Sequence, residues 1–393
     1  MAQLELQQLQ RLSIEQLSQL QVTSVEKRRQ PLADAPAAIY VITREEIVDS
    51  GATTIPEMLR LAPNLNVAQV NSSGYEVSAR GFNAGNNAIL SNKLLVLIDG
   101  RSVYTPLFGG VYWDMIGVQP QDIERIEVIS GPGATLWGAN AVNGVINIIT
   151  RNSSDTQGGL LTVGGGNYEL YDAIEYGGRL SPTLTYRVHG EFTHFNAFPA
   201  PGGGNAGDAW YKPQGGFRLD WNPPGQSLSL LGDFFDATEQ PGGTVRGGDA
   251  MVSYNRELSG GSHLQLLAYY DNAQRWSNNG LGFAVNTYDM EIQHSFKFAG
   301  WNSIVWGAGE RVVDYQIHFA STSSLRYEPP RATLNLANVF AQDTIALAPS
   351  LKLTLGLKLE DEPYAGVQPM PSIRLGWSPA DHVFFWAAVS RAV

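Results

Sequence analysis

The sequence predicts a compact α+β domain followed by long antiparallel β-strands of the type that cross a membrane. Three observations favour this fold class. Only 16 % of the 393 residues are charged, while 42 are glycine, 16 tyrosine and 15 phenylalanine, a profile that differs from both disordered and ordinary soluble chains. Residues 37–152 mix apolar strand patterns with short helical ones. After residue 152, segments of ten or more residues alternate between apolar and polar side chains.

Charge and motif content exclude several function classes. Lys and Arg number 26 against 37 Asp and Glu, and a net charge of −11 repels phosphate backbones, so we expect no nucleic-acid partner. The absence of cysteine excludes disulfides, thiolate metal sites and cysteine nucleophiles. Phosphate-binding, zinc-protease and α/β-hydrolase motifs are missing from the sequence. We predict no enzyme, no cofactor and no metal site, while His189 and His194 leave open a shared contact to a bound metal complex.

Residues 1–29 form a separate N-terminal segment. They lack the basic and apolar regions of a secretory signal peptide, so we interpret the sequence as a mature form. The charged run 26–29 and the prolines Pro31 and Pro36 then mark a linker.

The α+β domain begins with an apolar strand over residues 38–43. A short helix over residues 44–50 follows and ends at Gly51, a residue type that tolerates positive φ. Thr54 and Glu57 have the spacing of a capping box, which predicts a second helix that continues through Leu61 and that Pro63 ends. Further apolar runs predict strands over residues 93–98, 123–129 and 144–149.

Long alternating segments make up the rest of the chain. Tyr288, Met290 and Ile292 alternate with polar residues at 289, 291 and 293, and residues 184–192 and 351–360 repeat the pattern. Soluble sandwiches also alternate, but their strands centre on about 5–6 residues, whereas membrane barrels use about ten, with apolar side chains toward lipid. Tryptophans near segment ends suit the aromatic belts of a membrane surface. We therefore expect transmembrane β-barrel strands in contact with lipid.

A run within the α+β domain carries a family resemblance. Residues 122–150, DIERIEVISGPGATLWGANAVNGVINIIT, resemble the plug domain of TonB-dependent outer-membrane receptors. Arg80-Gly81-Phe82 and the segment LIDGR at residues 97–101 resemble other parts of that plug, and the resemblance covers roughly residues 30–152. It implies a plug inside a 22-stranded barrel in the outer membrane of a Gram-negative bacterium. The family's solutes are scarce ones, such as a ferric siderophore, cobalamin or a carbohydrate.

The chain departs from the family in the number of strands. Residues 157–393, at about 18 residues per strand and turn, give about 13 strands instead of 22. The last segment, residues 383–393, resembles an interior strand of such receptors and not the terminal one. We expect an incomplete or open barrel, and hence a C-terminally incomplete receptor that neither inserts nor transports by itself.

The N-terminal sequence LQVTSV at residues 20–25 is similar to the TonB box, which in the family pairs as an extra strand with the energy-transducing protein TonB. The residues expected to bind TonB are Gln21, Val22, Thr23, Ser24 and Val25.

The plug resemblance also implies contacts with the barrel and with the solute. Candidates for an ionic seam between plug and barrel are Arg80, Arg101, Glu124, Arg125, Glu127 and Arg151, unless they only flank strand ends on the plug surface. Candidates for an aromatic solute-binding surface are Tyr75, Tyr104, Phe108, Tyr112 and Trp113, unless these rings pack on the barrel wall. An alternative interpretation of the sequence is a soluble or periplasmic binding module with an isolated plug-like domain.

Overall fold

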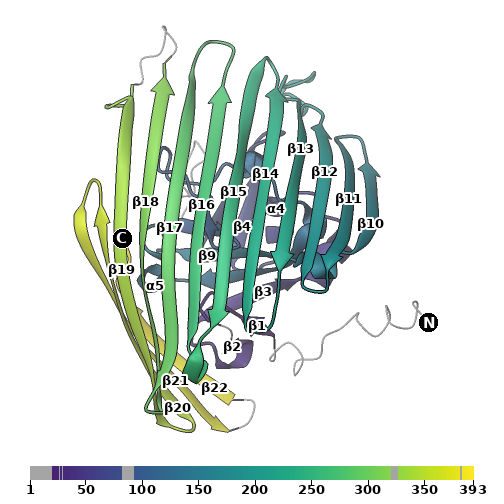
Figure 1. Ribbon diagram of the computed structural model, residues 1–393. Helices are drawn as coiled ribbons and strands as arrows, with labels where there is room; N and C mark the ends of the chain where they lie inside the picture. The colour runs from purple at the N-terminus through teal and green to yellow at the C-terminus, as the bar shows by residue number, and fades with distance from the viewer. Residues whose placement is uncertain (1–19, 26, 29, 82–92, 320–325, 381–382) are drawn as a thin grey trace.

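The computed structural model describes residues 20–25, 27–28, 30–81, 93–319, 326–380 and 383–393. Most of the N-terminal segment, residues 1–19, and Phe82 of the plug resemblance lie outside the described residues. The described chain forms two parts, which we call the plug (residues 30–152) and the wall (residues 158–390). The plug lies against the concave face of the wall (Figure 1).

A five-stranded sheet forms the centre of the plug. Its strand order is β3-β8-β9-β6-β7, and only the β6–β9 pair is parallel. The bounds are β3 Ala38–Thr43, β6 Leu94–Ile98, β7 Arg101–Ser102, β8 Ile123–Ser130 and β9 Gly144–Thr150. Both faces are covered, so the strands are nearly continuous apolar runs, as β6 shows with five buried residues in a row. The predicted strands over 38–43, 93–98, 123–129 and 144–149 are confirmed within one residue.

Two small hairpins and a few short helices accompany this sheet, of which β1 precedes the plug and η4 follows it. The hairpins pair β1 Gln21–Val22 with β2 Gln30–Pro31, and β4 Leu65–Gln69 with β5 Tyr75–Ala79. The α-helices are α3 Arg44–Ser50, α4 Ile55–Leu59 and α5 Ala134–Trp137. Single 3-10 turns are η1 Leu32–Asp34, η2 Trp113–Met115, η3 Pro120–Asp122 and η4 Ser153–Asp155, with η5 Ser259–Gly261 in the wall.

The predicted helix boundaries are partly right. Helix α3 ends at Gly51, which has a φ of 66°, as expected. The capping box predicted at Thr54 and Glu57 is wrong, because the Glu57 carboxylate pairs with Arg60 at 2.6 Å and the Thr54 side chain caps no amide. Helix α4 also stops at Leu59, short of the predicted Leu61. The capping box occurs one helix earlier, between Thr43 and Glu46.

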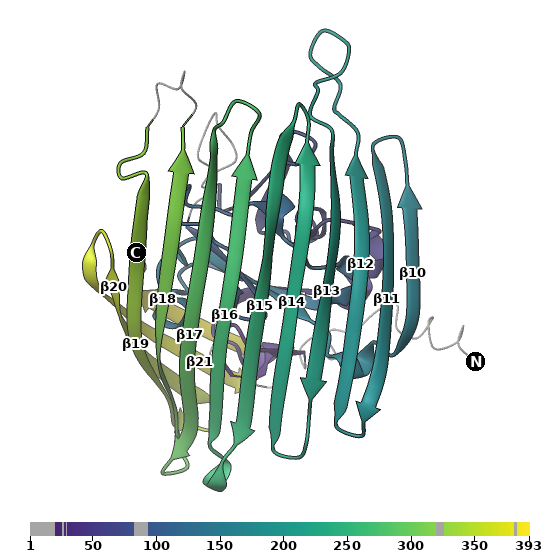
Figure 2. The ribbon, with the colours of Figure 1, turned by 45° about the horizontal axis from the view of Figure 1, so that its top comes forward.

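The wall is a single antiparallel sheet of 13 strands in chain order, which confirms the predicted number (Figure 2). The strands are β10 Gly158–Gly165, β11 Glu169–Ser181, β12 Leu184–Phe195, β13 Trp210–Trp221, β14 Gln226–Glu239, β15 Gly243–Glu257, β16 His263–Trp276, β17 Gly282–Phe298, β18 Asn302–His318, β19 Arg331–Ala348, β20 Leu351–Glu362, β21 Gly366–Ala380 and β22 Val383–Ser390. Within the described residues, β10 and β22 each pair with one neighbour only, so the sheet is open, as expected.

The two faces of the wall differ in polarity as the alternation predicts. Met290 and Tyr288 point outward and are 63 % and 49 % exposed, whereas Gln293 points toward the plug and is 3 % exposed. On β20, Leu357 is 45 % exposed and Lys358 only 3 %. An apolar outer face and a polar inner face are typical of a membrane barrel. No helix among the described residues is long and apolar enough to cross a bilayer.

Candidate functional site

The N-terminal hairpin lies folded against the underside of the plug. Val22 and Val25 are 0 % and 2 % exposed and pack in one cluster with apolar residues of the plug. The backbone N–H groups of Thr23 and Ser24 donate to the Glu127 carboxylate at 3.1 and 2.9 Å, and the Ser24 hydroxyl donates to the same oxygen at 2.5 Å. A carboxylate that accepts three bonds from one segment holds it firmly.

Two further plug side chains and one wall side chain hold the same segment. Trp137 donates from Nε1 to the Ser24 carbonyl at 2.7 Å, and Asn147 donates to the Ser24 hydroxyl at 3.0 Å. The Arg374 guanidinium of β21 donates to the Val25 carbonyl at 3.0 Å. Val22, Ser24 and Val25 are therefore buried between plug and wall, whereas Gln21 is exposed and Thr23 half-buried.

Lys27 continues this contact into the wall. Its ammonium lies 2.6 Å from the Glu291 carboxylate of β17 and over the rings of Trp137 and Phe340, at 4.8 and 4.7 Å from their centroids. Burial lowers the pKa of Lys27, and Glu291 opposes part of that shift. The charge stays paired inside a largely aromatic pocket, which couples the N-terminal segment to the wall.

Arg101 forms a deeply buried ion pair between plug and wall. Asp233, Asp249 and Asp271 lie side by side on β14, β15 and β16, because Asp249 is the register partner of both others. Carboxylates directly opposite one another repel. Arg101 contacts Asp249 at 2.7 Å and also pairs with Asp271. Burial by itself lowers the pKa of Arg101, but these carboxylates outweigh it and the net pKa is raised.

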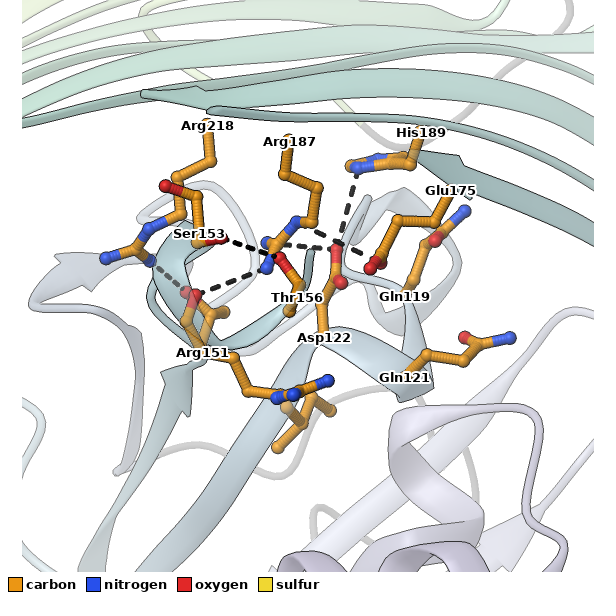
Figure 3. A network of polar contacts seen from close by, with 12 residues as sticks. Gln119, Gln121, Asp122, Arg151, Ser153, Thr156, Glu175, Arg187, His189 and Arg218 are labelled. Carbon is orange, nitrogen blue, oxygen red and sulfur yellow. Dashed lines mark hydrogen bonds and ion pairs between the residues drawn. The ribbon is translucent and has the colours of Figure 1, made fainter. Parts of the chain in front are cut away.

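A second polar network surrounds Asp122 at the start of β8 (Figure 3). Its carboxylate lies 3.0 Å from the Arg187 guanidinium and 3.5 Å from His189 Nδ1, both on β12. Arg187 also donates to the Arg151 carbonyl at 3.2 Å. Nearby, the Ser153 amide donates to Asp220 of β13 at 2.7 Å. Asp122, Arg187 and His189 are each about 5 % exposed or less, so plug and wall exchange charges in a water-poor interface.

A third contact is made at the end of the plug opposite the N-terminal hairpin. Arg275 of β16 pairs with Asp114 of the plug and lies 3.0 Å from Glu239 of β14. Lys212 of β13 donates to the Ile116 carbonyl at 2.8 Å. In the described part of the chain, no group of three or more acidic or histidine side chains is arranged to hold a metal ion.

The predicted ionic-seam residues have different surroundings. Arg101 contacts wall carboxylates, and Arg151 reaches the wall through its carbonyl. Arg125 pairs with Glu127 at 2.9 Å inside the plug, and Glu127 binds the N-terminal segment, so neither forms a described ion pair with the wall. Arg80 and Glu124 lie exposed on the plug surface. Both residues fit the alternative that some of these charges only flank strand ends.

The predicted aromatic residues pack instead of forming one open surface. Tyr75 and Trp113 are 6 % and 9 % exposed within the plug core, and Tyr104 packs beside it. Phe108 and Tyr112 reach the wall, where Tyr112 stacks on Phe283 at 5.3 Å between ring centroids. The alternative that these rings pack on the wall therefore describes Phe108 and Tyr112 better than a solute surface does.

Sequence reasoning missed the acidic plug residues that reach the wall. Asp99, Asp114 and Asp122 all pair with arginines of wall strands. In the sequence, these aspartates could be inferred only from the wall residues that pair with them. Arg187, His189 and Arg218 lie on the polar side of alternating strands. His189 and His194 do not converge, because they lie on opposite faces of β12.

Comparison with known proteins agrees with this architecture. The TonB-dependent Receptor Plug Domain family matches residues 31–145, and the TonB dependent receptor-like β-barrel family matches residues 150–393. A vitamin B12 transporter BtuB of Vibrio vulnificus (strain CMCP6) is 36 % identical over 148 residues, which are 37 % of this chain and 23 % of that protein. BtuB of Vibrio cholerae serotype O1 (strain M66-2) is 31 % identical over 207 residues, 51 % of this chain and 31 % of that protein.

Solved structures share the fold at low identity. The siderophore receptor PirA from Pseudomonas aeruginosa superposes with a TM-score of 0.70 at 20 % identity, covering 90 % of this chain and 64 % of that one. A mutant of the ferric enterobactin receptor PfeA from the same organism gives 0.73 at 18 % identity, covering 94 % and 63 %. The chain thus spans less than two thirds of the length of these relatives. The matched barrel family alone covers more than half of the residues, and the chain belongs to the family of TonB-dependent receptors.

Proposed function

We propose that this chain is part of a receptor for energised uptake of a scarce solute across the outer membrane of a Gram-negative bacterium, with TonB as its partner, and that it does not transport by itself. The observation that carries the proposal is the N-terminal segment Gln21–Val25. It begins as the short strand Gln21–Val22, is held by backbone hydrogen bonds at Thr23 and Ser24, and lies at the foot of a plug packed against a membrane-type wall. A segment that is bound through its main chain can exchange one strand partner for another with little dependence on side chains.

The nature of the contacts supports a plug that can move. The plug meets the wall through several buried ion pairs and hydrogen bonds together with apolar contacts such as Tyr112 on Phe283, whereas the exposed apolar side chains of the wall face outward. Polar contacts can be exchanged for water when the plug shifts, and the lipid-facing surface is left unchanged. A soluble or periplasmic module is the weaker proposal, because it would expose Met290 and its outward neighbours to water.

The names of the relatives set the order in which solutes are tested. Curated relatives are named vitamin B12 transporters, and solved relatives are named siderophore or ferric enterobactin receptors. We therefore propose to test cobalamin and a ferric siderophore first, and a carbohydrate after them. We propose that this chain supplies the plug and part of the barrel of such a receptor, without catalytic activity.

The test is binding of the detergent-purified full chain to the periplasmic domain of TonB. Thr23→Pro removes a backbone N–H from the segment, and we expect at least a tenfold loss of affinity. Thr23→Ala keeps the N–H and is the matched control, expected within about threefold of the unchanged chain. Equal binding by the two variants, or no binding by the unchanged chain, would contradict strand addition at this segment.

A further inference from the structure

A wall histidine lies between one carboxylate of the plug and one of the wall. His189 Nδ1 is 3.5 Å from Asp122 of the plug, and its Nε2 is 3.0 Å from Asp233 of β14. The three side chains are 5 %, 3 % and 13 % exposed. Figure 3 shows the ring of His189 directed toward Asp122.

The chemistry of imidazole makes this arrangement informative. A neutral ring carries one N–H and one lone pair, so it would point a lone pair at one of the two carboxylates. Only the imidazolium ion presents N–H to both oxygens. With both carboxylates nearly excluded from water, the charged ring is the form that this geometry accommodates.

The charged groups around the His189 ring are mainly carboxylates and favour one more positive charge. Glu175 of β11 is the register partner of His189, and Glu191 lies two residues along β12. Arg187 is the nearest cation and is shared between Asp122 and Glu175. The neighbouring arginines are already paired: Arg218 contacts Asp99 and Asp220, and Arg101 contacts Asp249 and Asp271. Lys212 of β13 interacts with Glu191 and Asp233. Even with Lys212 included, the carboxylates around the ring outnumber the cations, so the surroundings favour a positive charge on His189.

A glycine in the wall provides the space in which the His189 ring lies next to the Asp233 carboxylate. Gly216 of β13 is the other register partner of His189, and a Cβ there would lie 2.1 Å from Asp233 Oδ1 and 2.6 Å from the ring. A cavity of about 20 Å³ lined by Asp122, His189 and Asp233 adjoins them, enough for a water molecule that could carry a proton in or out.

We propose that Asp122, His189 and Asp233 form a proton-binding site shared by plug and wall, so that seating the plug takes up one proton. When the plug leaves, Asp122 leaves with it and the imidazolium loses one of its two partners. Because the seated state then binds the proton more tightly than the released state, plug seating is strongest at low pH. It weakens as pH rises through neutrality.

The experiment measures plug release in the full chain in detergent micelles. The sequence has no cysteine, so Thr135→Cys introduces a single thiol. Thr135 is 1 % exposed and donates to the Met370 carbonyl of β21, far along the sheet from His189, so maleimide reacts there only after release. At a fixed urea concentration below full unfolding, each labelling rate is divided by that of the fully unfolded chain at the same pH, because the thiolate is the reactive form. We expect this normalised rate to rise about tenfold from pH 6.5 to 8.5, within the limit for one linked proton.

The variant His189→Gln keeps a donor but cannot titrate, and its normalised labelling rate is expected to rise by much less than tenfold over this window. His194→Gln, on the outward face of the same strand, is the matched control and should retain the full pH dependence. A second measurement needs no variant of the site. Urea-driven release at pH 7.5 in weakly buffered solution should deliver about one proton per chain to the solvent. A tenfold rise that persists in His189→Gln, a normalised rate independent of pH in the unchanged site, or no proton release would each overturn the proposal.

Discussion

Arg101 illustrates how single residues decide whether the plug stays in the wall. Three aspartates stand in register across β14, β15 and β16, an arrangement that is unfavourable without a cation. The plug supplies that cation, with its guanidinium 5 % exposed. Without the plug, the wall aspartates Asp249 and Asp271 lose the guanidinium that pairs with them. Without the wall, the Arg101 guanidinium loses these two carboxylates.

We predict that Arg101→Ala weakens plug seating by about 3–5 kcal/mol, because it leaves buried carboxylates unpaired. The matched control is Arg246→Ala, whose pair with Asp236 is 59 % and 58 % exposed and contributes at most about 1 kcal/mol. The measurement is the urea midpoint at which the Thr135→Cys thiol becomes reactive. Equal midpoints for the two variants would contradict a dominant role for Arg101.

At the scale of an element, one carboxylate accepts three of the hydrogen bonds that hold the N-terminal segment. Glu127→Gln removes the charge that accepts from Thr23 and Ser24. Hydrogen bonds to a charged group contribute about 1.5–3 kcal/mol, so we predict at least tenfold faster trypsin cleavage after Lys27 or Arg28. Glu124→Gln changes an exposed carboxylate on the same strand and should leave the cleavage rate unchanged. Matching rates would show that Glu127 does not hold the segment.

Helix α3 gives a second prediction at this scale. Thr43 accepts from the Glu46 amide at 3.3 Å, and Glu46 accepts from the Thr43 amide at 2.8 Å. Thr43→Ala should cost about 1 kcal/mol and speed amide hydrogen exchange in residues 44–50 about fivefold. Thr54→Ala is the control, because Thr54 caps no amide. Faster exchange of α4 amides in Thr54→Ala would contradict the assignment of the capping box.

The positions of the strands were more predictable from the sequence than the contacts between residues of different strands. The apolar run of β6 and the alternation of β17 each follow from local periodicity, so strand positions and the two faces of the wall could be read directly. The pairing of Arg101 with Asp249 and Asp271 depends on register between strands far apart in sequence, which local patterns do not encode. The misplaced capping box has a local cause, since Glu57 prefers Arg60 three residues on.

At the scale of the whole molecule, the open sheet determines behaviour in a membrane. Within the described residues, the outer edges of β10 and β22 are unpaired, and each backbone group without a partner in hydrocarbon costs several kcal/mol. We predict that this chain, expressed with an export signal, gives no heat-modifiable band on gels of outer membranes and is degraded by protease. A protease-resistant, heat-modifiable band would show that the edges are closed in the bilayer.

The central claim is a wall with an apolar outer face and a largely polar inner face that packs against the plug. The most direct test is a scan of single spin-labelled cysteines over residues 288–293 of β17 in detergent micelles. We predict that labels at 288, 290 and 292 are accessible to oxygen within the apolar micelle, while labels at 289, 291 and 293 are immobilised against the plug, near Lys27. Accessibility without a period of two, or with the faces reversed, would contradict the account.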